Sequence, residues 1–189
     1  MVLQSLLVST GLVAIAEIGD KTQLLALLLA ARFRKPVPII LGILAATIAN
    51  HLLAALVGVA AGEVLQGPWL RWVLGAAFLG FAAWALIPDR FEEDAHPKER
   101  AGGSIFVTTL VAFFLVEMGD KTQVATVALA ARFHEVVMVA AGTTLGMMIA
   151  NVPVVFLGEA AAQRLPLKLI RGVAAASFAA IGVWILIFG

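Results

Sequence analysis

The sequence contains no cysteine, only three histidines and few charged residues. Without cysteine the chain forms no disulfide bond and offers no thiolate to a metal ion. Its net charge of +1 gives no sign of a nucleic-acid partner. The first twenty residues, MVLQSLLVSTGLVAIAEIGD, lack both a basic segment and a cleavage site of small residues after the apolar part. We therefore expect a retained helix there rather than a signal peptide.

Apolar residues dominate the chain. They make up 62% of the 189 residues, which is far above the share usual in a soluble fold. Six apolar segments are each near or above the roughly 20 residues that span a bilayer as a helix: residues 2–31, 37–61, 69–87, 104–131, 136–162 and 167–188. They are too long and too rich in Ala and Leu for barrel strands. The sequence predicts an all-α integral membrane protein with six transmembrane helices.

The second half of the chain repeats the first. EIGDKTQ at residues 17–23 returns as EMGDKTQ at 117–123, and AARF at 30–33 returns at 130–133. These matches predict two three-helix repeats, residues 1–88 and 104–189. Since each repeat crosses the membrane an odd number of times, the two are expected to be inverted relative to each other.

Loop charges give the expected orientation. The connections after the first, third and fifth segments carry nine Lys and Arg residues, whereas those after the second and fourth carry only Arg71 and Arg132. By the positive-inside rule both termini face outward and the polar linker, residues 89–103, is cytoplasmic. The linker is interpreted as a solvated tether, although its acidic residues and His96 leave a metal-sensing role open.

Both repeated motifs place ionisable side chains inside the membrane: Glu17, Asp20 and Lys21, and Glu117, Asp120 and Lys121. Each charge costs about 2.5–3.5 kcal/mol at a helix centre, so six unpaired charges would cost on the order of 15–20 kcal/mol. This exceeds the stability of most domains. We expect the six side chains to face inward, to pair, and to meet an ion or water.

The spacing within each motif allows a purely structural interpretation. On one helix the glutamate, aspartate and lysine share a face, so Glu17 could pair with Lys21, and Glu117 with Lys121. That interpretation leaves Asp20 and Asp120 each without a basic partner. The glycines of the motifs, Gly19 and Gly119, permit a local helix break of the kind that forms binding sites in transporters.

The charge balance of the two motifs predicts a cation site. Four carboxylates and two ammonium groups carry a net charge of minus two, which one divalent cation or two protons neutralise. Six more oxygen-bearing side chains are possible secondary ligands: Thr22, Gln23, Asn50, Thr122, Gln123 and Asn151. Oxygen donors favour hard cations such as Ca²⁺, Mn²⁺ or Mg²⁺, and the absence of Cys and of a repeated His argues against Cu or Zn. His51 has Val152 as its counterpart, so it is either a proton carrier of one repeat or a packed polar group.

The paired motifs, Glu, any apolar residue, Gly, Asp, Lys, Thr, resemble the signature of the Gdt family of cation/proton antiporters, and the resemblance covers essentially the whole chain. It implies a compact prokaryotic member in the plasma (inner) membrane that exports Mn²⁺, or Ca²⁺, in exchange for protons. Glu17, Asp20, Glu117 and Asp120 would be the cation and proton site. The resemblance implies a transporter rather than an enzyme, with membrane lipid, cations and protons as partners and no prosthetic group.

The expected mechanism is alternating access, in which the two repeats expose one midplane site to either side in turn. Lys21 and Lys121 would hold the carboxylates in place when no metal is bound. Two alternatives remain open. One is an intramembrane aspartyl protease that uses Asp20 and Asp120 as a dyad, although such a dyad needs neither the glutamates nor the repeated motif. The other is a small organic-cation or amino-acid exporter, which would need an apolar pocket beside the charges.

Overall fold

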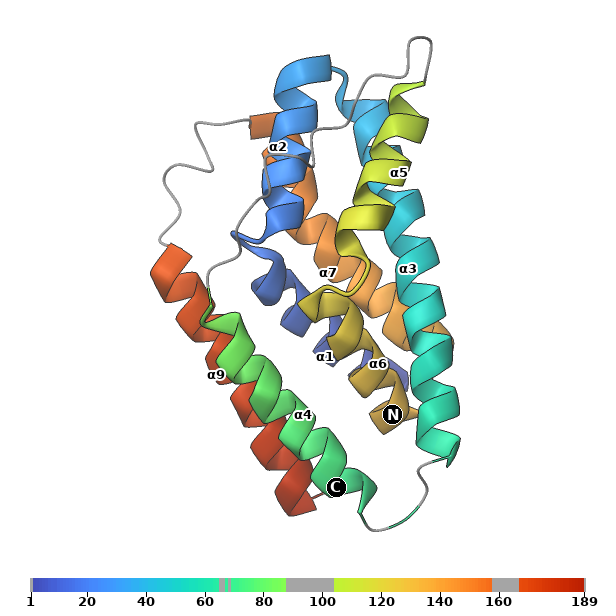
Figure 1. The fold of residues 1–189 in the computed structure, drawn as a ribbon, viewed down its shortest axis with the longest axis vertical. Coiled ribbons are helices and arrows are strands. Elements are labelled where there is room, and N and C mark those ends of the chain that lie inside the picture. The colour runs from blue at the N-terminus through green and yellow to red at the C-terminus, as the bar shows by residue number, and fades with distance from the viewer. Residues whose placement is uncertain (1, 65–66, 68, 88–103, 158–166, 189) are drawn as a thin grey trace.

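The structure is a computed structural model that describes residues 2–64, 67, 69–87, 104–157 and 167–188. The described residues form an all-helical protein, as predicted (Figure 1). Its helices are α1 (Val2–Glu17), α2 (Lys21–Phe33), α3 (Pro36–Val64), α4 (Leu70–Ala85), α5 (Ile105–Glu117), α6 (Lys121–Phe133), α7 (Val136–Leu157) and α9 (Leu167–Phe188). The predicted linker, residues 89–103, lies outside the described residues.

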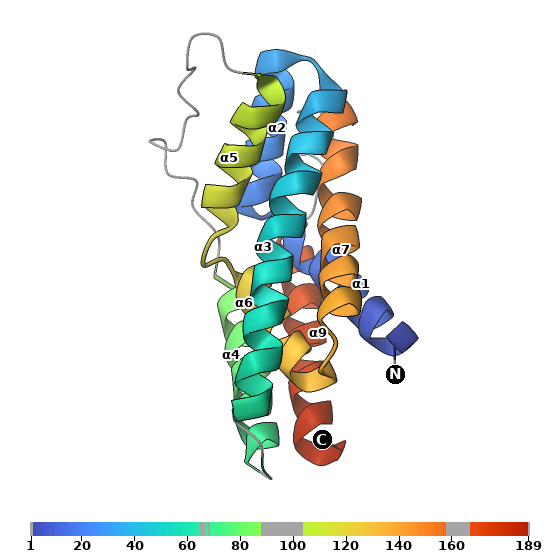
Figure 2. The same ribbon diagram turned by 90° about the vertical axis from the view of Figure 1, so that its right-hand side faces the viewer.

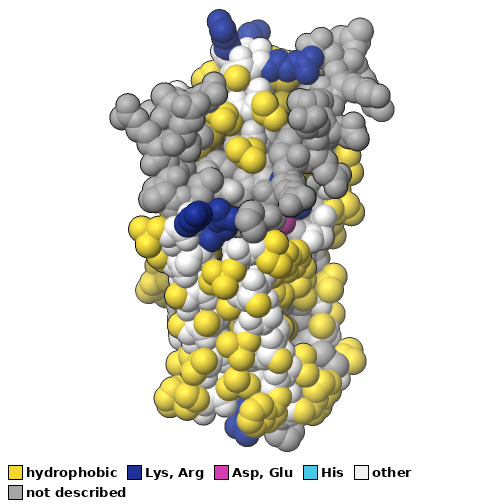
Figure 3. All heavy atoms as spheres, turned by 60° about the vertical axis from the view of Figure 1, so that its left-hand side comes forward, with side chains coloured by type: hydrophobic (Ala, Val, Ile, Leu, Met, Phe, Trp, Pro, Cys, Tyr) yellow, Lys and Arg dark blue, Asp and Glu magenta, His cyan; other side chains and the backbone are white. Residues whose placement is uncertain are grey.

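Within the described residues, three helices are long and apolar enough to cross a membrane: α3, α7 and α9, with mean hydropathies of 2.1, 1.7 and 1.9. The α1–α2 pair gives a fourth candidate span if it is counted as one segment, although the two helices are bent by 68°. Large apolar side chains such as Leu3, Leu53 and Leu115 are exposed. Figure 3 shows apolar side chains spread over much of the described part of one face. Such a surface suits contact with lipid.

Two of the six predicted segments are broken helices, and both break at the repeated motif. Gly19 and Gly119 have φ of 82° and 77°, a left-handed conformation that costs glycine little. The next residue, Asp20 or Asp120, is extended and precedes a new helix. The backbone N–H of each aspartate donates to the carbonyl of the motif glutamate at 3.1 Å. The local break that the glycines permit is therefore present in both halves.

The two halves contain corresponding helices in the same order: α1, α2, α3 and α4 match α5, α6, α7 and α9. Figures 1 and 2 show that α1 and α2 ascend toward the end of the molecule where α5 begins, whereas α5 and α6 descend from it. The chain thus runs in opposite directions through equivalent parts of the two halves.

The halves interlock because each broken helix packs on the long helix of the other half. α1 lies along α7, and α5 lies along α3. Small residues permit this close approach. A Cβ atom at Gly142 of α7 would lie 2.6 Å from the carbonyl oxygen of Leu6, and one at Gly42 of α3 would lie 2.8 Å from that of Phe106.

The remaining helices, α4 and α9, form an antiparallel pair that covers only part of the interlocked core (Figure 1). Their rings of Phe78, Phe81 and Phe178 pack with centroids 5.7–6.4 Å apart. The pair joins α1 and α6 in one hydrophobic cluster. A second cluster, built mainly from α2, α3 and α5, includes no described residue of α4 or α9.

Candidate functional site

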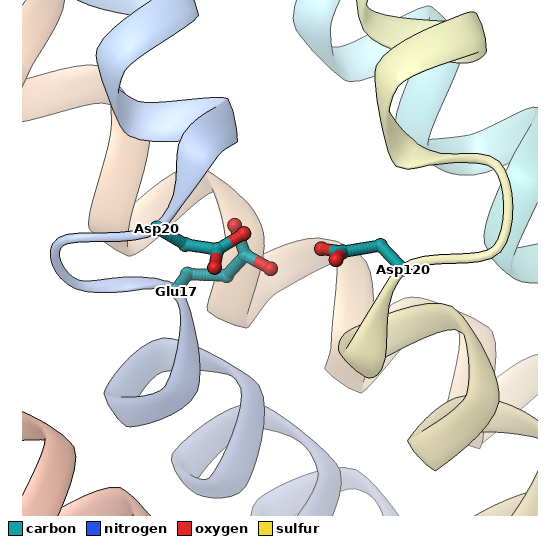
Figure 4. Close-up of side chains that lie close together, drawn as sticks. All are labelled: Glu17, Asp20 and Asp120. Atoms are coloured by element: carbon teal, nitrogen blue, oxygen red, sulfur yellow. The ribbon is translucent and has the colours of Figure 1, made fainter. Parts of the chain in front are cut away.

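The two helix breaks meet in the middle of the protein and bring three carboxylates together. One oxygen of each of Glu17, Asp20 and Asp120 lies within 4.8 Å of the others (Figure 4). All three side chains are buried, with 0%, 4% and 2% of their surface exposed. We call these three residues the carboxylate cluster.

The helix breaks suit negative charge at this place. Asp20 and Asp120 directly precede α2 and α6, so their carboxylates lie near the positive ends of two helix dipoles. Neither side chain caps its own helix by a hydrogen bond. One oxygen of each aspartate lies in the carboxylate cluster instead (Figure 4).

The lysines of the motifs pair across the two halves. Lys21 Nζ lies 3.2 Å from Asp120 Oδ1, and Lys121 Nζ lies 3.6 Å from Asp20 Oδ1. The expectation of the purely structural interpretation, that Asp20 and Asp120 have no basic partner, is therefore wrong. That expectation assumed one continuous helix, on which residues four apart are neighbours. Because the helix breaks after the glutamate, the lysine no longer lies one turn from it. Because the second half runs in the opposite direction, each lysine lies beside the aspartate of the other motif.

The two motif glutamates have different surroundings. Glu17 accepts a hydrogen bond from the Thr22 hydroxyl, and its Oε1 has no hydrogen-bond partner among the described residues. Glu117 is as deeply buried but lies against α3, with Oε1 2.8 Å from His51 Nε2 and Oε2 accepting from Asn50 Nδ2 at 3.2 Å. The structure thus brings three of the four predicted carboxylates together and places Glu117 in a separate contact.

The predicted secondary ligands divide into two groups. The side-chain oxygens of Gln23 and Gln123 accept hydrogen bonds from the backbone N–H groups of Gly19 and Gly119, at 2.8 and 2.6 Å. Gln23 also donates to the carbonyl of Ala150 at 3.0 Å. These two amides therefore brace the helix breaks rather than face the cluster.

Thr22 donates to Glu17, whereas the remaining secondary ligands, Thr122, Asn50 and Asn151, have oxygen atoms without a hydrogen-bond partner in the described residues. Among the predicted ligands in the described part of the chain, buried oxygens without a hydrogen-bond partner include Glu17 Oε1, Glu117 Oε1, Asp120 Oδ2, Thr122 Oγ1, Asn50 Oδ1 and Asn151 Oδ1. Leaving a buried acceptor unsatisfied costs about 1–3 kcal/mol. Carboxylate, amide and hydroxyl oxygens are donors that a hard divalent cation prefers. The chemistry of this region therefore suits such a cation, or water in its place.

The sequence leaves the role of His51 open and does not single out Arg171. His51 contacts Glu117, and the one signal in the sequence was its position beside Asn50 with Val152 as counterpart. Arg171 of α9 lines the same small cavity as Asp20 and Lys121. No motif surrounds Arg171, so only the packing of α9 on the core reveals its position.

Comparisons with known proteins show the family of the chain. A family model described as "Divalent cation/proton antiporter GDT1" matches residues 5–93 and 105–189. The "Putative manganese exporter" of Vibrio cholerae serotype O1 is 50% identical over 178 residues, which cover 94% of this chain and 88% of that protein. "GDT1-like protein sll0615" of Synechocystis is 30% identical over 195 residues, covering 92% and 93% of the two chains. No solved structure matches the chain. The chain belongs to the GDT1 family of divalent cation/proton antiporters.

Proposed function

We propose that this protein exports Mn²⁺ from the cytoplasm of a prokaryote in exchange for protons, with Ca²⁺ as the next candidate cargo. The observation that carries the proposal is the buried carboxylate cluster at the junction of two broken helices. Its oxygen donors favour hard cations, a class that includes both ions. Mn²⁺ ranks first because the relative from Vibrio cholerae is named for manganese.

The lysine contacts support an exchange in which charge stays balanced. Three carboxylates and two ammonium groups leave the cluster and its lysines with a net charge of minus one. An arriving cation takes the place of Lys21 and Lys121 at the aspartates, and protons later displace the cation. Glu117, the fourth carboxylate, completes the site as the cycle proceeds. The lysines thus hold the aspartates in position between cations.

The packing of α4 and α9 supports alternating access by inverted repeats. Both helices cover α1 and α6, whereas the equivalent elements, α5 and α2, are not part of their cluster. Arg132 lies 5.3 Å above the ring of Trp184, yet its counterpart Arg32 lies over Phe33. In the other state of the transporter, α4 and α9 would pack on α5 and α2 instead of α1 and α6. Arg32 would then lie over Trp84, and the site would be open to the other side of the membrane. The proposed topology has six spans, with both termini outside and residues 89–103 in the cytoplasm.

The two alternatives receive less support. A protease dyad shares a proton between two aspartates, whereas Asp20 and Asp120 each face a lysine. The family is one of transporters, which argues against an enzyme. Neither the family nor the relative from Vibrio cholerae favours an exporter of organic cations or amino acids.

Uptake into proteoliposomes with an imposed pH gradient tests the proposal. Wild type is expected to move Mn²⁺, to move Ca²⁺ less well, and to discriminate against Mg²⁺. Asp20→Asn is expected to lower the Mn²⁺ rate at least tenfold, because it removes one of the three clustered carboxylates. Glu63→Gln, an exposed carboxylate on α3 outside the site, is the matched control and is expected to keep the wild-type rate. Transport of no divalent cation, or a normal rate in Asp20→Asn, would refute the proposal.

A further inference from the structure

We propose that His51, together with Asn50, is a positioning residue that holds Glu117 out of the carboxylate cluster. The two motif glutamates, which are equivalent in sequence, would then differ in function: Glu17 holds the cation, and Glu117 is withheld until a later step. The inference rests on the proposed function, because it assigns roles within the same cation site.

Both oxygens of Glu117 are engaged by α3. His51 Nε2 lies 2.8 Å from Oε1, and Asn50 donates to Oε2 at 3.2 Å. The side chains of Glu117 and His51 are fully buried, and Asn50 is 1% exposed. A buried carboxylate with a hydrogen bond on one oxygen and a close histidine contact on the other is held firmly, because water cannot replace either contact.

The equivalent contacts are missing around Glu17. Val152 stands where His51 stands in the first half, and it has no donor to offer. Asn151, the counterpart of Asn50, donates instead to the carbonyl and the sulfur of Met147 on its own helix, at 3.1 and 2.9 Å. Glu17 is therefore free to lie with Asp20 and Asp120 (Figure 4).

The backbone does not explain this difference, since the two breaks have nearly the same conformation. Gly19 and Gly119 differ by five degrees in φ, and Asp20 and Asp120 have similar extended dihedrals. The hydroxyls of the motif threonines differ as the glutamates do. Thr22 donates to Glu17, whereas Glu117 accepts a hydrogen bond from Asn50 of α3 in place of one from Thr122. The different placement of Glu17 and Glu117 therefore arises from one position of the repeat, which is His51 on α3 and Val152 on α7.

Withholding one carboxylate has a consequence for transport. A site with four carboxylates binds a divalent cation more tightly than a site with three, yet a transporter must also release its cargo. His51 would keep the affinity low enough for release, and it would do so in one half only. The two repeats differ at this position, where the first has His51 and the second has Val152. The inference explains this difference by a role of His51 in cation exchange.

The test measures Mn²⁺ binding to the purified full chain in detergent by titration calorimetry. His51→Val, which installs the residue of the other half, is expected to lower the Kd for Mn²⁺ at least tenfold, because Glu117 can then join the cluster. Adding Glu117→Gln to His51→Val is expected to abolish this gain. His51→Gln keeps an N–H donor and is expected to stay within twofold of wild type. In proteoliposomes His51→Val should lower both KM and the maximal rate, a combination that a merely structural role would not give.

An unchanged or higher Kd in His51→Val would overturn the inference. Should that variant fail to fold, Glu17→Gln and Glu117→Gln in the wild-type background decide the matter. We expect Glu17→Gln to raise the Kd at least tenfold and Glu117→Gln less than threefold, and equal effects would contradict the asymmetry. Failure of the wild type to bind any divalent cation would instead refute the proposed function.

Discussion

Each aspartate of the motifs combines three features: burial, a position just before a helix, and a lysine from the opposite half. Burial makes an isolated charge costly, and the helix dipole and the lysine offset part of that cost. The pairing is reciprocal, with Lys21 at Asp120 and Lys121 at Asp20. A cation that enters must compete with these lysines, so they should set its affinity.

Replacing one lysine tests this competition. Lys21→Gln removes the ammonium group 3.2 Å from Asp120, so Mn²⁺ no longer competes with it, and the Kd for Mn²⁺ is expected to fall several-fold. The cation-free protein is expected to lose stability, because Asp120 remains buried without its partner. Titration calorimetry and thermal unfolding measure the two effects. Lys35→Gln, an exposed lysine outside the site, is the control and should leave both unchanged. Weaker Mn²⁺ binding in Lys21→Gln would show that the lysine supports the cation site rather than competing for it.

At the scale of the element, the broken helices position the site. The sequence predicts that the motif lies in an apolar segment, that its charges turn inward and that glycine permits a break there. The lysine–aspartate pairs do not follow from the sequence, because the spacing of residues 17–21 indicates neighbours only on a continuous helix and the helix is broken there. The sequence also could not assign Gln23 and Gln123, since an amide within a polar motif can equally bind a ligand or brace a turn. Their hydrogen bonds to the backbone of Gly19 and Gly119 depend on the break itself.

The break in the second half can be tested at Gly119. Its φ of 77° lies in the left-handed region, although a Cβ atom there would meet no atom within 4 Å. Gly119→Ala is therefore expected to destabilise the protein through backbone strain alone, by about 1–2 kcal/mol, and to slow Mn²⁺ transport by displacing Asp120.

Gly80→Ala is the matched control for that substitution. Gly80 lies inside α4, and a Cβ atom there would also meet no atom within 4 Å, so alanine should be neutral or stabilising. Thermal unfolding in detergent compares the two variants. An equal change in unfolding temperature in both variants would show that the left-handed conformation at Gly119 adds no strain in Gly119→Ala.

For the whole molecule, the repeat predicted two related halves, and the structure shows them with opposite chain directions (Figure 1). The structure places α4 and α9 against α1 and α6 and not against the equivalent helices α5 and α2. This choice could not be predicted, because the sequences of the two repeats are equivalent and favour neither position. Under alternating access this placement is a property of one state. The other state would have the roles of the two halves exchanged.

Cross-linking tests for that second state, and the absence of cysteine leaves no background reaction. The double variant Arg132→Cys with Trp184→Cys, at two side chains that stack at 5.3 Å here, should react with a short bifunctional thiol reagent. The equivalent double variant, Arg32→Cys with Trp84→Cys, should also be cross-linked in membranes, and either cross-link should stop transport. Cross-linking of the first pair alone would mean that the exchanged arrangement is not formed.

The central claim is that a divalent cation and protons use one site in turn. The most direct test is to record Mn²⁺ uptake and the internal pH of proteoliposomes together, starting with a Mn²⁺ gradient and no pH gradient. The account predicts that inward Mn²⁺ flow drives protons outward through the wild type, and that Asp120→Asn abolishes both flows together. Mn²⁺ uptake without proton movement, or proton movement that persists in Asp120→Asn, would contradict it.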